Sequence, residues 1–463
     1  MTIATPPNLR ANAWTGAVSP AGELATSSWG QRGRALKDNT LLAPTPVDER
    51  DWMHPDIGWG LVLPDNEAIT EAERATAADA PEPIRNLLAA RPGSPVLRYR
   101  ADLENGWLRR YYPDRPFQDM SVQASRPGVG EGRLPRYLLI AGSPTELPWS
   151  IQYQLNMSRY VGRLDLDEGG LANYVNALLA DWAGPQPDAS APVLWNVDHG
   201  GNDITRLMAF AIGEKLWERL AVDADAANRK RLTGNDATAA KLADTLSQHK
   251  PAFVATTSHG MTGPLDDAQQ LAARLGLLVD GDYAALDPAT LLGGWAPSGA
   301  IWYAHACCSA GSDTASRYAD LFPQGDSLAT LLAGVSAGAG SRSAPLPRAL
   351  LGAARPLRAF VGHVEPTFDW TLRDPDTGQI LTHEIVSALY NQLFRRDFPT
   401  PIGYALGGLF REAGAFFAGW SEAVGAINDN VAGARATALY RKLVAMDRQG
   451  IVLLGDPTVC LSA

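Results

Sequence analysis

Cysteine and histidine are the residues of this sequence whose positions could support covalent chemistry. Three cysteines occur in 463 residues, and two of them, Cys307 and Cys308, are adjacent in the segment AIWYAHACCSAGSD. They follow an apolar run that has the length of a β-strand. A thiol needs a nearby base or positive charge to supply thiolate at neutral pH. A histidine at the end of a neighbouring strand could be that base.

Polar motifs follow three apolar runs along the chain. VLWNV is followed by DHGGND at 198–203, FVATT by SHGMTG at 258–263, and AIWYA by HACCSAG at 305–311. Ligands of parallel sheets bind beyond the carboxyl ends of the strands. We therefore expect His259 and Cys307 to lie at one edge of a sheet, with the histidine acting on the thiol.

The elements that would position these motifs alternate between buried strands and amphipathic helices. Strand-length apolar runs occur at 136–142, 191–197, 251–257, 300–304, 355–362 and 451–462. The spacing of apolar residues predicts helices at 171–182, 203–220, 237–248 and 383–394 and within 403–446. This alternation predicts an α/β fold with a mostly parallel sheet that is flanked by helices on both faces.

The motifs S-H-G-x-x-G and x-A-C-x-S-x-G, each closing an apolar strand, together resemble the His-Cys dyad of caspase-like (clan CD) cysteine peptidases. His259 and Cys307 are 48 positions apart, close to the roughly 50 residues that separate the pair in caspases. RYLLIAGSPTELPW with the following YVGRLDLDEGGLANYVNALL, and LLGDPT near the C-terminus, are similar to segments of the gingipain-like branch. The resemblance covers residues 136 to 460 and implies a caspase/gingipain-like sheet.

The resemblance also implies a role for each matching residue. Cys307 would attack a peptide carbonyl, and His259 would assist the thiol and protonate the leaving amine. The amides of Gly260 and Cys307 would form the oxyanion hole. The implied activity is that of a cysteine endopeptidase that uses a thioacyl-enzyme intermediate and needs no metal or organic cofactor. Its partners would be protein or peptide substrates, and relatives of this type serve as regulated proteases in bacterial stress or defence cascades.

Substrate specificity is predicted from the residues that follow the strands. The loop after VLWNV corresponds to the caspase-like loop that supplies a charged S1 residue, and here it offers Asp198 and Asp203. These acids favour Arg or Lys at P1, although Asp203 precedes a helix and could instead cap it. His305 occupies a position where relatives place an S1-pocket residue. Further cleft-lining candidates follow the next strand: Glu365, Asp369 and Trp370.

Other interpretations of the same residues stay open. His199 is a rival base, although its separation of 108 positions from Cys307 is too long for the family pattern. A zinc site built from His305, Cys307 and Cys308 is another alternative, which adjacent cysteines suit poorly. We expect Cys308 to point into the core, because successive strand residues alternate faces. The alternative function is a non-catalytic caspase-like scaffold that binds partner proteins.

The predicted organisation has three parts: residues 1–132 as an N-terminal extension, 133–190 as a leading subdomain and 191–463 as the catalytic domain. The extension has little predicted regular structure apart from a hairpin turning at Asn105-Gly106, and it could be regulatory. SRPGVGEG at 125–132 is typical of a linker. Arg229, Lys230 and Arg231 lie in a predicted loop between helices, where this enzyme or an activating protease could process the chain.

Composition limits the class of protein and of partner. The chain is 46% hydrophobic and carries a net charge of -10, which disfavours nucleic acid and anionic membranes and is compatible with cationic substrates. The first residues lack the features of a signal peptide, and no run of about 18 apolar residues is present. Three cysteines cannot form a disulfide framework, so we expect a cytoplasmic location.

Overall fold

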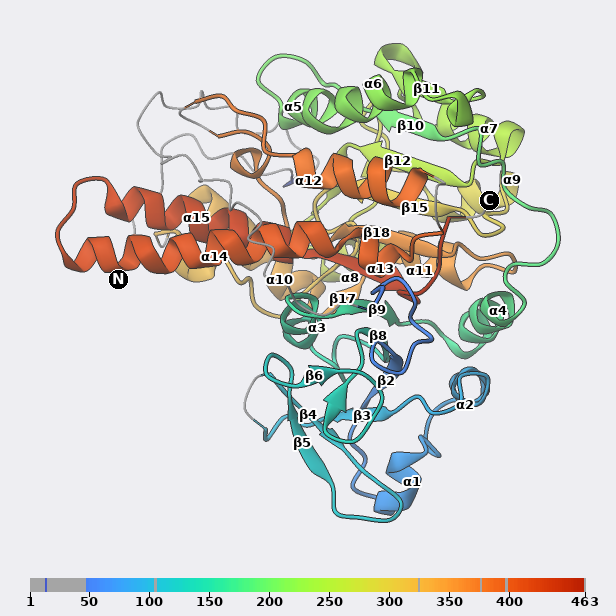
Figure 1. Ribbon diagram of the computed structural model, residues 1–463. Coiled ribbons are helices and arrows are strands. Elements are labelled where there is room, and N and C mark those ends of the chain that lie inside the picture. The colour runs from blue at the N-terminus through green and yellow to red at the C-terminus, as the bar shows by residue number, and fades with distance from the viewer. Residues whose placement is uncertain are drawn as a thin grey trace.

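The computed structural model describes residues 13–14, 47–103, 106–323, 325–374, 377–395 and 399–461. Its main feature is a 12-stranded sheet. In Figure 1 this sheet runs from β10 and β11 at the top to β4 and β5 at the bottom. The strands, in their order across the sheet, are β11 (Lys230–Thr233), β10 (Val193–Asn196), β12 (Phe253–Thr257), β15 (Ile301–His305), β18 (Ala359–His363), β19 (Ile451–Gly455), β9 (Tyr160–Leu164), β8 (Tyr137–Ala141), β2 (Trp59–Pro64), β3 (Val96–Tyr99), β4 (Trp107–Arg110) and β5 (Gln118–Ser121).

Most neighbouring strands are parallel, as predicted, but the sheet contains two runs of opposite direction. Strands β11, β10, β12, β15 and β18 are parallel to one another. Strand β19 is antiparallel to β18 and begins a second parallel run with β9, β8, β2 and β3. Strands β4 and β5 complete the edge as an antiparallel meander. The strands of the two parallel runs therefore point in opposite directions, and their carboxyl ends lie on opposite sides of the sheet.

Alternation along the strands sends side chains to a core on each face of the sheet. Leu61 and Leu139 belong to the core that includes buried residues of α2 (Glu82–Ala89) and α4 (Glu168–Leu179). Leu138 and Ile140, from the same strand as Leu139, belong to a second core with residues of α3 (Trp149–Asn156). Helices therefore cover both faces, as the sequence pattern predicts.

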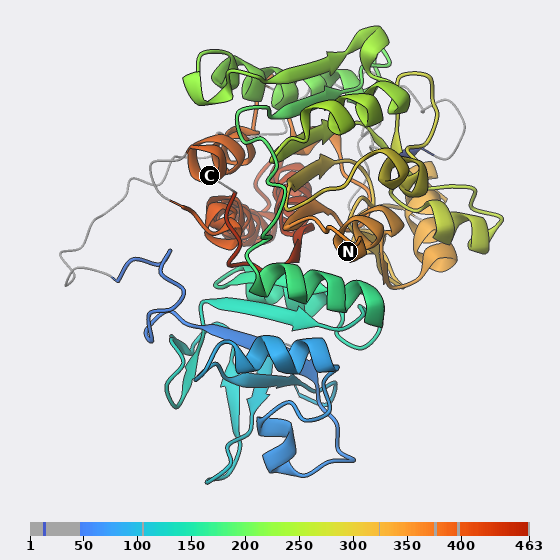
Figure 2. The same cartoon turned by 90° about the vertical axis from the view of Figure 1, so that its right-hand side faces the viewer.

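The direction of each crossover determines on which face of the sheet the helices beside the first parallel run lie. The chain moves one way along the sheet from β10 to β11 and the other way from β11 through β12 and β15 to β18. Right-handed crossovers then put α7 (Ala239–His249), α9 (Pro288–Gly294) and α11 (Pro345–Gly352) on the face that carries α4. In Figure 2, α2 in blue and α4 in green lie in front of the strands as part of this layer.

The opposite layer contains a continuous helical segment and a long hairpin. The segment predicted at 203–220 consists of α5 (Ile204–Met208), the π-helix η1 (Ala209–Glu214) and α6 (Lys215–Ala221). Helices α14 (Gly407–Asn428) and α15 (Ala434–Gln449) pack along each other and form the arm at the left of Figure 1. The remaining α-helices of the described residues, together with the second π-helix, are α1 (Glu71–Ala75), α8 (Ala268–Arg274), α10 (Ser327–Ala339), α12 (His383–Val386), η6 (Ser387–Phe394) and α13 (Ile402–Ala405).

The expectation of little regular structure before residue 133 is wrong. Strands β2 to β5 belong to the main sheet, and β2 is paired with β8 on one side and β3 on the other. The strands β3 and β4 are antiparallel, as predicted for a hairpin, whereas Asn105 lies outside the described residues. The segment 125–132 is not a free linker, because β6 (Arg126–Pro127) pairs with β7 (Arg133–Leu134) and Val129 N–H donates to Pro55 O at 2.9 Å.

The prediction of a loop around Arg229, Lys230 and Arg231 is also wrong. Lys230 and Arg231 lie in β11, which pairs with β10 at the edge of the sheet. Arg231 forms an ion pair with Glu214 at 2.8 Å, and Arg229 lies over the Trp217 ring. A protease needs an extended, accessible backbone, so processing here would first require β11 to leave the sheet.

A search of the described residues for membrane-spanning helices finds none that is both long and apolar enough to cross a bilayer.

Candidate active site

The three predicted motifs do follow neighbouring parallel strands. Asn196 at the end of β10 is paired with Thr257 at the end of β12, and Thr257 is paired with His305 at the end of β15. The pairing continues past the strands, since Ser258 N–H donates to His305 O at 3.3 Å. The predicted meeting of these motifs at one edge of the sheet is therefore confirmed.

His259 is held by a carboxylate from the neighbouring motif. It begins β13 (His259–Met261), and its fully buried ring places Nε2 2.9 Å from Asp203 Oδ2. An ionised carboxylate only accepts hydrogen bonds, so Nε2 carries the proton and Nδ1 is the nitrogen that can accept another. This is the tautomer that a general base needs.

Asp203 is fixed by the first turn of a helix. Its Oδ1 accepts hydrogen bonds from Thr205 N at 2.8 Å and Thr205 Oγ1 at 2.6 Å, which caps α5. Burial acts to raise the pKa of Asp203, but hydrogen bonds from His259 and Thr205 outweigh it and hold the pKa well below its ordinary value. The capping role considered for Asp203 is thus present. Both carboxylate oxygens have partners inside the protein, which leaves Asp203 poorly suited to bind a substrate cation.

The His199 side chain packs against the ring of His259. The two rings stack with centroids 5.4 Å apart, and the Tyr283 ring also stacks on His199, with centroids 4.1 Å apart. Nε2 of His199 lies 2.9 Å from the carbonyl oxygen of Asp280, to which it donates. Burial lowers the pKa of His199. The fold therefore makes His199, the rival base suggested by the sequence, a direct neighbour of His259.

Cys307 lies in a tight turn directly after β15. Ser309 N–H donates to Ala306 O at 3.3 Å, so the two cysteines are the central residues of the turn. The Cys307 sulfur accepts a hydrogen bond from Thr367 N at 3.3 Å and is fully buried. Burial raises the pKa of Cys307 well above its ordinary value, and the neighbouring Cys308 raises it further. The thiol is therefore protonated at neutral pH in this arrangement.

The histidine and cysteine motifs are in contact through their main chains. A Cβ atom on Gly260 would lie 1.9 Å from the carbonyl oxygen of Cys307, so only glycine fits here. Gly260 directly follows His259, and the two segments touch at this point. The side chains of the predicted pair have different partners in this structure: Asp203 holds His259, and the main chain of Thr367 holds Cys307.

Cys308 points into the core, as predicted. It belongs to a buried cluster that includes Leu271 of α8, Leu275 just after that helix, and Val335 of α10. Its φ of 56° lies in the left-handed region, which non-glycine residues rarely adopt. Such conformations cluster at functional sites because the surrounding fold must hold them.

Most of the predicted specificity residues are inaccessible in this structure. His305 is fully buried, with Nδ1 2.8 Å from the Tyr303 hydroxyl. Glu365, Asp369 and Trp370 are also buried. Asp198 is exposed, and its Oδ1 accepts from Gly200 N at 2.8 Å. Of the acids proposed for the S1 pocket, Asp198 is the one whose carboxylate faces solvent.

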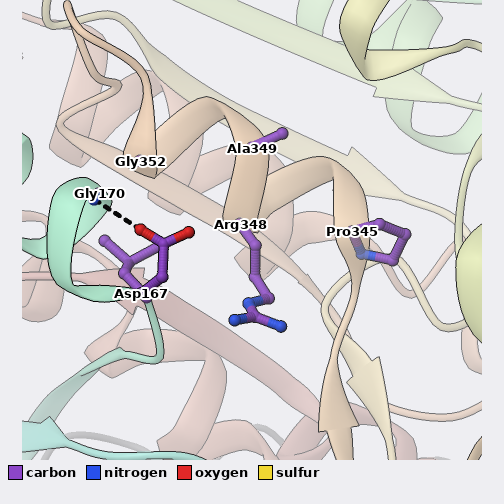
Figure 3. Close-up of a pocket in the computed structure, with 7 residues that line it drawn as sticks. Asp167, Gly170, Pro345, Arg348, Ala349 and Gly352 are labelled. Carbon is purple, nitrogen blue, oxygen red and sulfur yellow. Dashed lines mark hydrogen bonds between the residues drawn. The ribbon is translucent and has the colours of Figure 1, made fainter.

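A cavity of about 320 Å³ lies elsewhere on the molecule, between the start of α4 and helix α11. Figure 3 shows Arg348 and Pro345 of α11 opposite Asp167, whose carboxylate accepts from Gly170 N at 2.7 Å. This cavity follows β9, which belongs to the second parallel run and ends at the other edge of the sheet. None of the predicted site residues lines it.

Two contacts at the site were not predicted from the sequence. The amide of Thr367 reaches Cys307 only because the segment after β18 folds back over the turn, and no sequence pattern indicates that. The sequence did contain an indication that Asp203 could meet His259, because both residues follow neighbouring strands. Neither a model of a known protein family nor a curated protein sequence matches this chain.

Proposed function

We propose that this chain is a cysteine endopeptidase with a caspase/gingipain-like fold, in which Cys307 is the nucleophile and His259 the general base and acid. The observation that carries the proposal is the main-chain contact between Gly260, next to His259, and Cys307. The bond from His259 to Asp203 adds support, because a base must be held in one tautomer to accept the thiol proton.

The proposed reaction proceeds through a thioester. The Cys307 thiol gives its proton to Nδ1 of His259, and the sulfur bonds to the carbonyl carbon of the peptide. The amides of Gly260 and Cys307 stabilise the oxyanion. His259 then passes the proton to the nitrogen of the leaving amine as the C–N bond breaks. Water, deprotonated by His259, hydrolyses the thioester, and the proton returns to the sulfur.

The proposed enzyme is latent in this arrangement. The Cys307 sulfur is fully buried, and burial is the main cause of its raised pKa. A rearrangement that frees the sulfur from Thr367 and brings it to the histidine would lower that pKa and expose the nucleophile. Activation by a partner protease or by a substrate-driven movement would have this effect. In a reducing cytoplasm, our proposed location, both thiols would stay free.

We further propose that the residue before the cleaved bond is Arg or Lys. Asp198 supplies an exposed carboxylate at the edge of the sheet that carries the dyad. The net charge of -10 also favours the approach of basic peptides. Because Asp203 is engaged with His259 and Thr205, the preference rests on Asp198.

A second candidate function is a scaffold that binds partner proteins without catalysis. The observation that favours it is the complete burial of both Cys307 and His259. The two candidates differ in one measurable property, since a scaffold has no reactive thiol at this position.

The deciding experiment is labelling with a peptidyl-arginine ketone that alkylates active cysteines. We expect one adduct, located by mass spectrometry at Cys307 and absent from Cys307→Ala. In His259→Ala the labelling rate should fall by about 100-fold or more, because general base catalysis is lost. Cys460→Ala, which removes a thiol elsewhere, should label like the wild type. Failure of the wild type to label both before and after limited proteolysis, or full labelling of His259→Ala, would overturn the proposal.

Comparing the new N-termini that the wild type and Cys307→Ala generate in a bacterial lysate would then test the substrate class. The proposal expects termini that follow Arg or Lys and that depend on Cys307. Termini that appear equally with both proteins would favour the scaffold.

A further inference from the structure

Three metal-ligating side chains come together beside the proposed nucleophile. His199, Asp203 and His259 each offer one ligand atom, and these atoms all lie within 4.8 Å of one another. His199 and Asp203 come from the loop after β10, and His259 comes from β13. The group contains no cysteine, so its geometry is independent of the state of Cys307.

The dimensions of the cluster suit a zinc ion. Zinc binds histidine nitrogen and carboxylate oxygen at about 2.0–2.1 Å, so tetrahedral ligand atoms lie about 3.3 Å apart. The His259 Nε2 to Asp203 Oδ2 distance is 2.9 Å, and no pair in the cluster exceeds 4.8 Å. The first distance is slightly shorter than the required separation, and 4.8 Å is an upper bound for the other two pairs. Small side-chain shifts would therefore complete three positions, and water would take the fourth.

Metal-binding side chains are usually oriented by hydrogen bonds to neighbouring groups, and such bonds are present around this cluster. Nε2 of His199 donates to the carbonyl oxygen of Asp280, the kind of bond that orients a metal-binding histidine. If Nε2 keeps this bond, the ligand atom that His199 offers is Nδ1. Asp203 Oδ1 is held by Thr205, and the His199 amide donates to Thr205 Oγ1 at 3.0 Å. These contacts orient Asp203 and His199 toward the cluster and still allow small shifts of their side chains.

We propose that His199, Asp203 and His259 form a zinc site that reversibly switches off the thiol chemistry. Zinc binds Nε2 of His259 and displaces the proton that now forms the hydrogen bond to Asp203. That proton moves to Nδ1 of the same ring. With Nδ1 protonated and Nε2 bound to the metal, His259 can no longer accept the proton of Cys307. Binding of zinc stands on the cluster alone, whereas its effect on cleavage rests on the proposed function.

This site differs from the zinc alternative considered for the cysteines. Within the described residues, His305, Cys307 and Cys308 do not bring three ligand atoms together, and the group that does so contains two histidines and a carboxylate. The metal would therefore bind to the base and not to the nucleophile, which makes the two arrangements distinguishable.

Binding is tested by calorimetry with zinc chloride on the full chain after metal removal. We expect one ion per chain, and His199→Asn should weaken its binding by about 100-fold or more, because loss of a ligand exceeds the loss of an outer partner. His383→Asn changes an exposed histidine outside the cluster and serves as the matched control. Cys307→Ala should bind zinc as the wild type does. Substitution of cobalt should give a visible spectrum of tetrahedral nitrogen and oxygen ligands without a thiolate charge-transfer band.

The outcomes separate this proposal from the peptidase proposal. Zinc binding that His199→Asn abolishes, in a protein whose Cys307 never labels, would support the site and overturn the peptidase. Labelling of Cys307 in a protein that binds no zinc would do the reverse. Loss of zinc binding in Cys307→Ala, or unchanged binding in His199→Asn, would overturn the zinc site. If both proposals hold, zinc should block labelling of the wild type, and a chelator should restore it.

Discussion

Asp203 is the residue on which the chemistry of the site depends most directly. One carboxylate oxygen caps α5 through Thr205, and the other holds Nε2 of His259. The first turn of a helix fixes the position of the side chain that caps it. The helix that follows β10 therefore orients the histidine that follows β12.

Two substitutions should separate the roles of the two acids near the site. Asp203→Asn keeps the cap but lets an amide N–H face His259, which favours the wrong tautomer. We expect kcat to fall by about 100-fold or more with every peptide substrate. Asp198→Asn should lower kcat/KM for peptides with Arg at P1 and leave peptides with other P1 residues unaffected.

Steady-state assays with matched Arg and neutral P1 peptides measure the difference. Equal effects of the two substitutions on all substrates would contradict these assignments.

Glu365 should make stability depend on pH. Burial raises its pKa from 4.5 to about 7. Between these values the folded protein keeps a proton that the unfolded chain has lost, so stability falls as the pH rises through this window. Glu365→Gln removes the penalty. Relative to wild type, the variant should gain up to about 3 kcal/mol of unfolding free energy between pH 4.5 and pH 7, and no more above it.

Urea unfolding at several pH values tests this expectation. Glu67→Gln changes an exposed acid and serves as the control. A constant difference between Glu365→Gln and wild type at all pH values would show that Glu365 ionises normally in the folded state.

At the scale of elements, the small sheet beside the site has an unexpected member. Strand β13 is antiparallel to β14 (Leu278–Val279) and parallel to β1 (Ala13–Trp14), with Ala13 paired with Gly260. An extended peptide that adds to a sheet edge makes this kind of contact. The pairing places a stretch of the N-terminal region next to the residue that touches Cys307.

We expect β1 to slow access to the site. Deleting residues 1–14 removes β1, whereas deleting residues 1–12 keeps it and serves as the control. The larger deletion should speed modification of Cys307 by a small neutral thiol reagent by about 5- to 10-fold, which corresponds to roughly 1 kcal/mol of pairing. Rates for Cys307 are read by mass spectrometry. Equal rates in the two deletions would mean that β1 does not protect the site.

At the scale of the whole molecule, the N-terminal and C-terminal parts are tied together at one buried acid. Asp456, in the LLGDPT segment, accepts a hydrogen bond from Trp59 Nε1 at 3.1 Å and pairs with Arg91 at 3.0 Å. Its amide donates to the hydroxyl of Tyr174 at 2.7 Å. Residues from the predicted extension, the leading subdomain and the end of the chain therefore meet at this point.

Asp456→Ala should destabilise the whole chain. It leaves Arg91 without its buried partner, and breaking a buried pair costs about 3 kcal/mol or more. Glu218→Ala breaks an exposed ion pair with Lys215 and should cost less than about 1 kcal/mol. Unfolding free energies from urea titrations compare the two. A small effect of Asp456→Ala would mean that the parts of the chain are joined mainly by the shared sheet.

Local pattern was sufficient for much of the fold. Runs such as FVATT and IWYA are mostly apolar because a central parallel strand is buried on both faces, and the helix at 171–182 has the apolar spacing of a covered face. The order of these elements also indicated which edge of the sheet collects His259 and Cys307. The strand β2, by contrast, is a short run among prolines and glycines, and its neighbours β3 and β8 decide its pairing.

The sequence by itself determined the alternation of strands and helices and the edge of the sheet where the histidine and cysteine motifs meet. Those features depend on residues close together in the chain. Only the tertiary structure decided that Asp203 holds His259, that His199 stacks on it, and that Thr367 holds a buried, protonated Cys307. These contacts join segments dozens of residues apart, so they depend on how whole elements pack and not on any local pattern.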